Sequence, residues 1–462
     1  VREGIALALG KCSSLLTPAE VPLAVDFLLG AGLADDAPAV RDCMVKAGTL
    51  LVDAHGAQHA QTMMPLFEGY LGPNKGSLSE ESYDRVREGA VVFLGTLARH
   101  LPKEDPKVRS VLGSLLEALT IPSESVQRAV SACLIPLMPA VSADREYVDA
   151  LIKRLLEMLT RAERYGDRRG AAFGIAGVVK GLGIASLKAY LIMDALKGAV
   201  ENKKEALARE GSLFAFEALS ERLGRLFEPY VIHILPMLLV CFGDTQPAVR
   251  EATEGAARAI MGQLSGQGVK LVLPSLLNGL DDDKWRTKQG STQLLGSMAY
   301  CAPKQLSTCL PTIVPRLGDV LGDPHPKVQS SAREALQEVG SVIRNPEVQR
   351  LVPNLLAALA EPNKHTKTCL EVVLKTVFVN TIDAPSLALI LPVVQRGLRD
   401  RSGDTKKRAA RIVGNMCQLI NDAKDMEPYV PLLMPELQKA LVDPLPEVRA
   451  TAAKAMGSLL HG

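Results

Sequence analysis

The densest group of residues that could do chemistry is basic and lies between positions 364 and 411. Ten Lys or Arg residues stand there against four acidic residues, a local charge of +6 in a chain whose formal net charge is +2. Lys406, Lys407 and Arg408 are consecutive and follow the flexible pair Ser402-Gly403. Clustered cations of this kind bind the phosphates of RNA or an acidic protein partner. The alternative is a solvated basic face without a ligand.

Two smaller basic groups lie earlier in the chain. One is Arg168-Arg169, and the other surrounds the single tryptophan, Trp285. An indole can stack on a nucleic-acid base, and the alternative is that it packs between the helices of its repeat. The candidate binding residues are Arg168, Arg169, Lys284, Trp285, Arg286, Lys288, Arg399, Arg401, Lys406, Lys407, Arg408 and Arg411, and Arg396 could extend the last group.

Residues suited to catalysis or to a cofactor are sparse. His55 and His59 are four apart and could hold a metal on a helix, but no third ligand is evident, so a solvated helix end is the alternative. Gly181-Leu182-Gly183 resembles the start of a dinucleotide-binding turn, yet it follows a helical pattern instead of a strand. The sequence has neither a Gly-x-x-x-x-Gly-Lys-Ser/Thr loop nor a Gly-x-Ser-x-Gly elbow. We predict no enzymatic activity, no metal and no cofactor.

These residues must be positioned by a repeat. A basic or amide residue recurs near the start of a predicted helix at twelve positions from Arg2 to Arg449, a span of 447 residues over eleven intervals. The period of about 41 residues is typical of helical hairpins stacked in the HEAT manner. Glycine follows eight residues later in five repeats, at Gly10, Gly95, Gly177, Gly296 and Gly457.

The other helix of each predicted hairpin is apolar and often contains proline, at Pro236, Pro274, Pro311, Pro353, Pro392 and Pro431. Both helices carry apolar residues at helical spacing, as in Val448, Ala452, Ala455 and Leu459. A single hairpin cannot bury two apolar stripes, so neighbouring hairpins must stack. We predict an all-α, right-handed α-solenoid of about twelve HEAT-type helical hairpins.

The cysteines and the lack of targeting segments indicate in which cellular compartment the protein acts. The eight cysteines are scattered and form no Cys-x-x-Cys pair, and there is no signal peptide and no apolar run of about 18 residues. We predict a reduced, cytoplasmic protein without membrane association. Val1 lies inside a predicted helix, so we expect the chain to be a piece of a longer polypeptide.

Two segments resemble a known family. The segment 281–345, which opens DDDKWRTKQG, and the segment 165–185, YGDRRGAAFGIAGVVKGLGIA, resemble the central region of the general control non-derepressible family of translational activators. A weaker likeness, from about 202 to 457, is to the HEAT array of fungal elongation factor three, through GLRDRSGDTKKRAARIVGNMCQLI and PEVRATAAKAMGSL. We divide the chain into generic HEAT repeats over 1–160 and, continuous with them, repeats over 161–462 that resemble the elongation-factor-three-like region.

The resemblance implies a non-catalytic scaffold that associates with ribosomes, through a ribosomal protein or rRNA. It implies that the scaffold helps to activate the kinase that phosphorylates initiation factor two during amino-acid starvation. It also implies a partner of the ATP-binding-cassette class, and kinase contact through a segment outside this chain. The ATP hydrolysis of elongation factor three is not implied, because its cassettes lie outside the helical array. The alternative is a HEAT-repeat adaptor that binds only proteins, of the transport or phosphatase-scaffold type.

Overall fold

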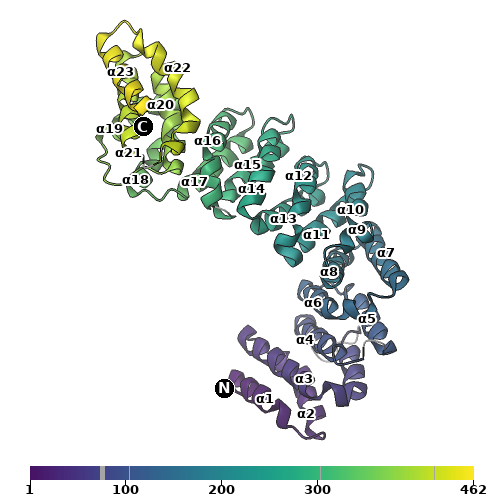
Figure 1. Ribbon diagram of the computed structural model, residues 1–462. Helices are drawn as coiled ribbons and strands as arrows, with labels where there is room; N and C mark the ends of the chain where they lie inside the picture. Colours follow the sequence, from purple (N-terminus) through teal and green to yellow (C-terminus); the bar gives the residue numbers. More distant parts are fainter. Residues whose placement is uncertain (73–78, 103–104, 302, 421, 462) are drawn as a thin grey trace. The chain divides into compact units, whose positions relative to one another are not determined.

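The computed structural model (Figure 1) describes residues 1–72, 79–102, 105–301, 303–420 and 422–461. Over these ranges it is built of helices, and the one β feature described is an isolated parallel bridge between Ile382 and Ile420. The chain forms two compact units. The first contains Val1–Phe227 and Gln246–Ile260, and the second contains Glu228–Thr245 and Met261–Gly462.

The helices follow one another as the repeat predicts. In the first unit they are α1 (Arg2–Cys12), α2 (Glu20–Phe27), α3 (Pro38–Gly69), α4 (Glu80–Ala98), α5 (Pro106–Ala118), α6 (Glu124–Val141), α7 (Arg145–Arg161), α8 (Tyr165–Leu182), α9 (Ser186–Ala189), α10 (Ile192–Glu201), α11 (Ala206–Leu223) and most of α13 (Pro247–Gln263). In the second unit they are α12 (Glu228–Phe242), α14 (Gly266–Gly279), α15 (Trp285–Cys301), α16 (Pro303–Val320), α17 (Pro326–Ser341), α18 (Pro346–Ala360), α19 (Pro362–Lys375), α20 (Ala384–Leu398), α21 (Gly403–Leu419), α22 (Val430–Leu441) and α23 (Pro446–His461). The prediction of an all-α, HEAT-type array is confirmed.

Consecutive second helices of the hairpins pack directly on each other. In the first unit α6 lies on α8 and α8 on α11, and in the second unit α15 lies on α17 and α21 on α23. Glycine allows this close approach. A Cβ atom at Gly177 in α8 would lie 2.5 Å from the carbonyl oxygen of Ser131 in α6, and one at Gly296 in α15 would lie 2.9 Å from the Cα atom of Ala335 in α17. Gly211 in α11 allows a similar approach to a first helix, since its Cβ would lie 2.0 Å from the carbonyl oxygen of Leu159 in α7. The recurrent glycine of the sequence therefore marks helix contacts, except at Gly457, which has no neighbour within 4 Å.

The recurrent basic or amide residue fixes the turn before its own helix. In four repeats the side chain donates to two backbone carbonyls five to eight residues earlier, over 2.7–3.0 Å. The donors are Arg41, Gln127, Arg168 and Arg449. Carbonyls at the end of a helix have no partner within the helix. A long donor side chain at this position therefore stabilises the turn, which explains why either arginine or glutamine serves.

One described stretch, Ala206–Phe242, is long and apolar enough to cross a membrane by length and composition alone. It consists of α11 and α12, which are joined by a 3-10 turn over Gly224–Phe227 where Gly224 has a φ of 58°. Within the first unit α11 packs on α7, α8 and α10 and buries Phe214 and Phe216. Core packing between repeats accounts for the apolar character of α11.

Replacing Gly211 by alanine tests the close approach of helices. The added Cβ would overlap the Leu159 carbonyl, so we expect the free energy of unfolding to fall by about 1–3 kcal/mol or more, as in overpacked cores. Urea unfolding followed by circular dichroism measures it. The matched control is Gly198→Ala in α10, where no atom lies within 4 Å of the new Cβ. Because alanine favours helix, this variant should be unchanged or more stable by up to about 1 kcal/mol. Equal stability of the two variants would contradict the interpretation.

Candidate functional site

Most of the predicted binding cations contact acids of a neighbouring repeat. Lys406 Nζ lies 2.7 Å from Asp443 Oδ2, and Arg399 Nε lies 2.9 Å from Glu436 Oε1. Lys407 pairs with Glu447 and Arg408 pairs with Glu371. The partners are 37 to 40 residues apart, about one repeat. We call these contacts the inter-repeat pairs. They neutralise much of the charge that the sequence concentrates between 364 and 411.

One form of inter-repeat pair recurs at three turns. Arg2 contacts Asp35 at 2.9 Å, Lys288 contacts Asp323 at 2.9 Å, and Lys406 contacts Asp443 at 2.7 Å. Each aspartate also accepts the backbone N–H two residues later, from Ala37, His325 and Leu445 respectively. These aspartate side chains are only 6–9% exposed. A cation of one repeat thus holds the turn that begins the second helix of the next.

Arg168 and Arg169 also form inter-repeat pairs, in the first unit, and these pairs are more deeply buried. Arg168 Nη2 lies 2.6 Å from Glu210 Oε2, and the two side chains are 5% and 6% exposed. Arg169 contacts Glu217 through both terminal nitrogens, at 2.5 and 3.2 Å. Its guanidinium carbon also lies 5.0 Å from the ring centre of Phe214. A ligand would reach Arg168 only after this buried pair had opened.

Trp285 joins the start of α15 to the turn before α17. Its ring stacks on His325 with 3.9 Å between ring centres and 8° between planes. The Arg286 guanidinium lies 4.4 Å and the Lys327 ammonium 5.5 Å from its centre. The indole is partly exposed. It therefore has an aromatic partner in the following repeat and two cations beside it.

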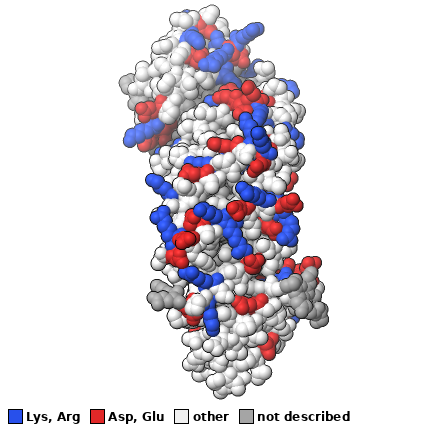
Figure 2. Space-filling model, turned by 90° about the vertical axis from the view of Figure 1, so that its right-hand side faces the viewer, with Lys and Arg blue, Asp and Glu red and all other residues white. Residues whose placement is uncertain are grey.

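Four of the predicted cations remain available to a ligand. In the part of the chain that the structure describes, Lys284, Arg286, Arg401 and Arg411 are exposed and form no ion pair. The first two lie beside Trp285 and the other two lie before and within α21. Figure 2 shows basic and acidic side chains next to each other over much of the face it presents, without a broad area of one sign. On this face any anion contact is therefore local.

The geometry of a metal site is not found among the described residues. His55 Nε2 donates to the carbonyl of Ser13 at 2.7 Å, and its ring centre is 6.1 Å from that of His59. No group of three His, Cys, Asp or Glu side chains in the described ranges could hold a metal. His55 and His59 are therefore two separate histidines in this geometry.

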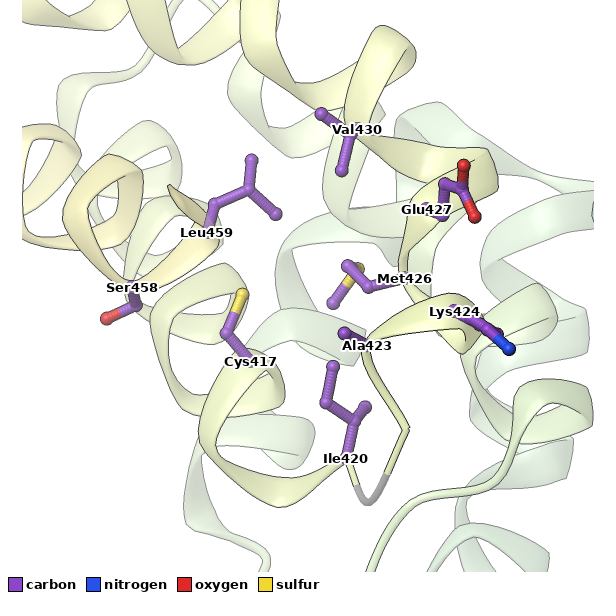
Figure 3. Close-up of a pocket in the computed structure, with 9 residues that line it drawn as sticks. All are labelled: Cys417, Ile420, Ala423, Lys424, Met426, Glu427, Val430, Ser458 and Leu459. Carbon is purple, nitrogen blue, oxygen red and sulfur yellow. The ribbon is translucent and has the colours of Figure 1, made fainter. Parts of the chain in front are cut away.

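Figure 3 shows a cavity of about 260 Å³ between α21, α23 and the segment that joins α21 to α22. Ser458 and Leu459 lie on one side, and Lys424 and Glu427 lie on the other. Cys417 is in its wall, and burial raises the pKa of this thiol. A thiol with a raised pKa is a poor nucleophile at neutral pH. Cys417 is therefore not an activated nucleophile.

Comparison with known proteins decides the family. Family models described as "Stalled ribosome sensor GCN1, HEAT repeats", "EF3 N-terminal HEAT repeat" and "Elongation factor 3/GNC1 HEAT repeat" match residues 1–99, 168–336 and 363–462. The chain is 50% identical over 461 residues to "Stalled ribosome sensor GCN1" of Homo sapiens. The aligned region covers 100% of this chain and 17% of the relative. The chain belongs to the GCN1 family.

Two further relatives agree. "Protein ILITYHIA" of Arabidopsis thaliana is 56% identical over 467 residues, and "eIF-2-alpha kinase activator GCN1" of Dictyostelium discoideum is 49% identical over 464 residues. Each covers 100% of this chain, which spans 17% of each relative. The resemblance drawn from 165–185 and 281–345 is thereby confirmed, together with the likeness to elongation factor 3.

Residues 1–99, where the sequence indicated only generic repeats, also match a GCN1 family model. The division at 160 stays a prediction.

Sequence reasoning missed the acidic halves of the inter-repeat pairs. These acids include Glu210, Glu436 and Asp443, and each lies about one repeat after its cation. Searching for an acid at the repeat distance from each cation would have found them. The predicted roles of all twelve candidate residues in binding remain predictions.

Breaking the buried pair Arg168–Glu210 tests its structural role. We expect Arg168→Leu to lower the free energy of unfolding by about 3–5 kcal/mol, because an uncompensated carboxylate stays buried. The double variant Arg168→Leu/Glu210→Leu should lose less than the sum of the two single variants. Urea unfolding measures all three. Arg109→Leu is the control, since its pair with Asp144 is 54% and 37% exposed and should contribute little. If the stability losses of the two single variants add up to the loss of the double variant, the pair does not have this structural role.

Acid should weaken the turn at Asp443. The ammonium of Lys406 and the backbone N–H of Leu445 hold the pKa of Asp443 below its ordinary value of 3.8. This carboxylate therefore contributes stability above pH 3.8, and the contribution is lost as pH falls through the lower folded pKa. Thermal unfolding between pH 6 and pH 3 should show a smaller acid-dependent loss in Asp443→Asn than in the parent. Identical pH profiles would show that this pair does not stabilise the array.

Proposed function

We propose that this chain is a segment of a non-catalytic, ribosome-associated scaffold that helps to activate the kinase of initiation factor two. Such a scaffold would act in the cytoplasm when ribosomes stall, as in amino-acid starvation. The observation that carries the proposal is 49–50% identity, over the whole chain, to proteins named as a stalled ribosome sensor and an eIF-2-alpha kinase activator. These names favour the ribosome-associated function over a protein-only adaptor.

The contact with the ribosome is proposed to use exposed cations at helix starts. Lys284 and Arg286 flank Trp285, while Arg401 and Arg411 flank the paired cations of α21. Phosphate binding needs charges that are not already neutralised, which favours these four residues over those held in inter-repeat pairs. Lys288, Arg399, Lys406, Lys407 and Arg408 are proposed to act indirectly, by fixing the turns that present the free cations.

The proposed partners extend beyond the ribosome. Family resemblance supports a partner of the ATP-binding-cassette class. It also supports kinase contact through a part of the longer relatives that this chain does not include. The array itself supports a scaffold role, because stacked hairpins offer long surfaces for macromolecules.

The variant Arg401→Glu/Arg411→Glu tests the proposed ribosome contact without breaking a described ion pair. Each lost phosphate contact should lower the salt slope of log affinity by about 1, so the pair should lower it by about 2. Co-sedimentation with purified ribosomes across a salt series measures affinity and slope, and circular dichroism reports folding.

The control is Lys203→Glu/Lys204→Glu, which makes the same charge change at two exposed lysines in the turn before α11. Ribosome binding should persist in this variant. Equal losses of ribosome affinity in both variants would indicate nonspecific electrostatic attraction. Unchanged affinity in Arg401→Glu/Arg411→Glu would show that these two residues are not part of the contact.

A further inference from the structure

A half-buried arginine on α20 lacks a carboxylate partner. The contact described for the Arg396 guanidinium is a long one, 3.4 Å from Nη1 to the carbonyl of Leu359. Among the described residues it forms no ion pair, whereas Arg399, almost one turn later, is held by Glu436 at 2.9 Å. Burial lowers the pKa of Arg396, because the charged guanidinium has lost part of its water. A desolvated cation without an anion is unusual in a protein built on ion pairs.

Arg396 lines a pocket of about 220 Å³ in the second unit. The apolar walls come from four first helices of the hairpins and include Val314 on α16, Leu359 on α18, Leu391 on α20 and Leu433 on α22. These four residues are buried, at 3% exposure or less. The cavity therefore combines an apolar interior with an arginine that has no anionic partner among the described residues.

Two prolines inside helices help to form this pocket. Pro315 lies within α16 and Pro392 within α20, and both are in its lining. Proline has no N–H, so each interrupts the hydrogen-bond ladder of its helix and bends it. The recurrent proline of the first helices thus coincides with a cavity at Pro392, whereas in α16 the lining proline, Pro315, is a second one that follows the recurrent Pro311.

Two groups of the lining, the Arg396 guanidinium and the Tyr429 hydroxyl, can donate hydrogen bonds to a negatively charged occupant. Tyr429 is 2% exposed, and its hydroxyl has no hydrogen-bond partner among the described residues. Asp319, exposed on α16, acts on Arg396 through charge but forms no ion pair with it. Since Glu436 already holds Arg399, Arg396 is the cation left to attract a carboxylate.

The size of the pocket limits what can fill it. Sites for drug-sized ligands usually measure about 300–1,000 Å³, so a cavity of about 220 Å³ accommodates one large apolar side chain. We propose that this pocket binds an acidic peptide segment of a partner protein. An apolar side chain of the segment fills the space between α16 and α20, and an adjacent carboxylate pairs with Arg396. The inference does not rest on the proposed ribosome contact, which uses other residues.

The probe for the test is the dipeptide acetyl-leucyl-aspartate amide, added to the full chain with labelled Leu and Val methyl groups. Methyl resonances of Val314, Leu359, Leu391 and Leu433 should shift with a Kd of about 1 mM, typical of a very small ligand. Acetyl-leucyl-asparagine amide has the same shape without the charge. It should bind about tenfold more weakly, which is the ratio expected for one charge-assisted hydrogen bond.

Variants of the protein separate the pocket from general attraction. Arg396→Gln should bind the aspartate probe about tenfold more weakly, and Asp319→Asn should bind it more tightly because a competing carboxylate is gone. The matched control is Arg350→Gln, which removes an exposed charge on α18 outside the lining and should leave binding unchanged. Absent shifts at the four methyl groups, equal affinity for the two dipeptides, or equal losses in Arg396→Gln and Arg350→Gln would each overturn the proposal.

Discussion

The packing of one helical hairpin on the next is the interaction on which the other features of this protein depend. A hairpin in isolation cannot cover the apolar sides of both its helices, so each repeat is completed by its neighbours. Glycine at positions such as Gly177 and Gly296 brings second helices into backbone contact. Donor side chains such as Arg168 then tie the adjoining turns to that contact. A change in any repeat is therefore felt in the two repeats beside it.

The same stacking decides the electrostatic surface. Cations at the starts of second helices face acids one repeat away, and the pairs range from the exposed Lys407–Glu447 to the buried Arg168–Glu210. Pairs of the buried kind contribute little net stability compared with apolar packing, but they penalise any stacking that separates them. Their main effect in this protein is to fix which repeat surfaces meet. Only the few cations outside these pairs are left to bind partners.

This division suits the scaffold role that we propose for the protein. A segment of a GCN1-family scaffold needs a backbone that keeps its repeats in register and surface groups free to engage other molecules. Second-helix starts carry the free cations Lys284 and Arg401, while first helices enclose the pocket around Arg396. The two kinds of surface differ in chemistry, since one offers exposed charge and the other a half-buried charge beside apolar walls. Different partners can therefore be held by different helices of the same hairpins.

The sequence by itself determined the class of fold, the repeat and the family. These follow from local or strictly periodic signals: helical spacing of apolar residues, a donor about every 41 residues, and long motifs such as DDDKWRTKQG. Only the tertiary structure decided which cations are free. The local charge of +6 gave no warning that Lys406 faces Asp443, or that Arg168 is buried against Glu210. Nor did it indicate that Trp285 stacks on His325, or that Arg396 has no carboxylate. The reason is physical: periodicity fixes which side of a helix a residue occupies, whereas a salt bridge depends on how far one hairpin rotates and slides on the next.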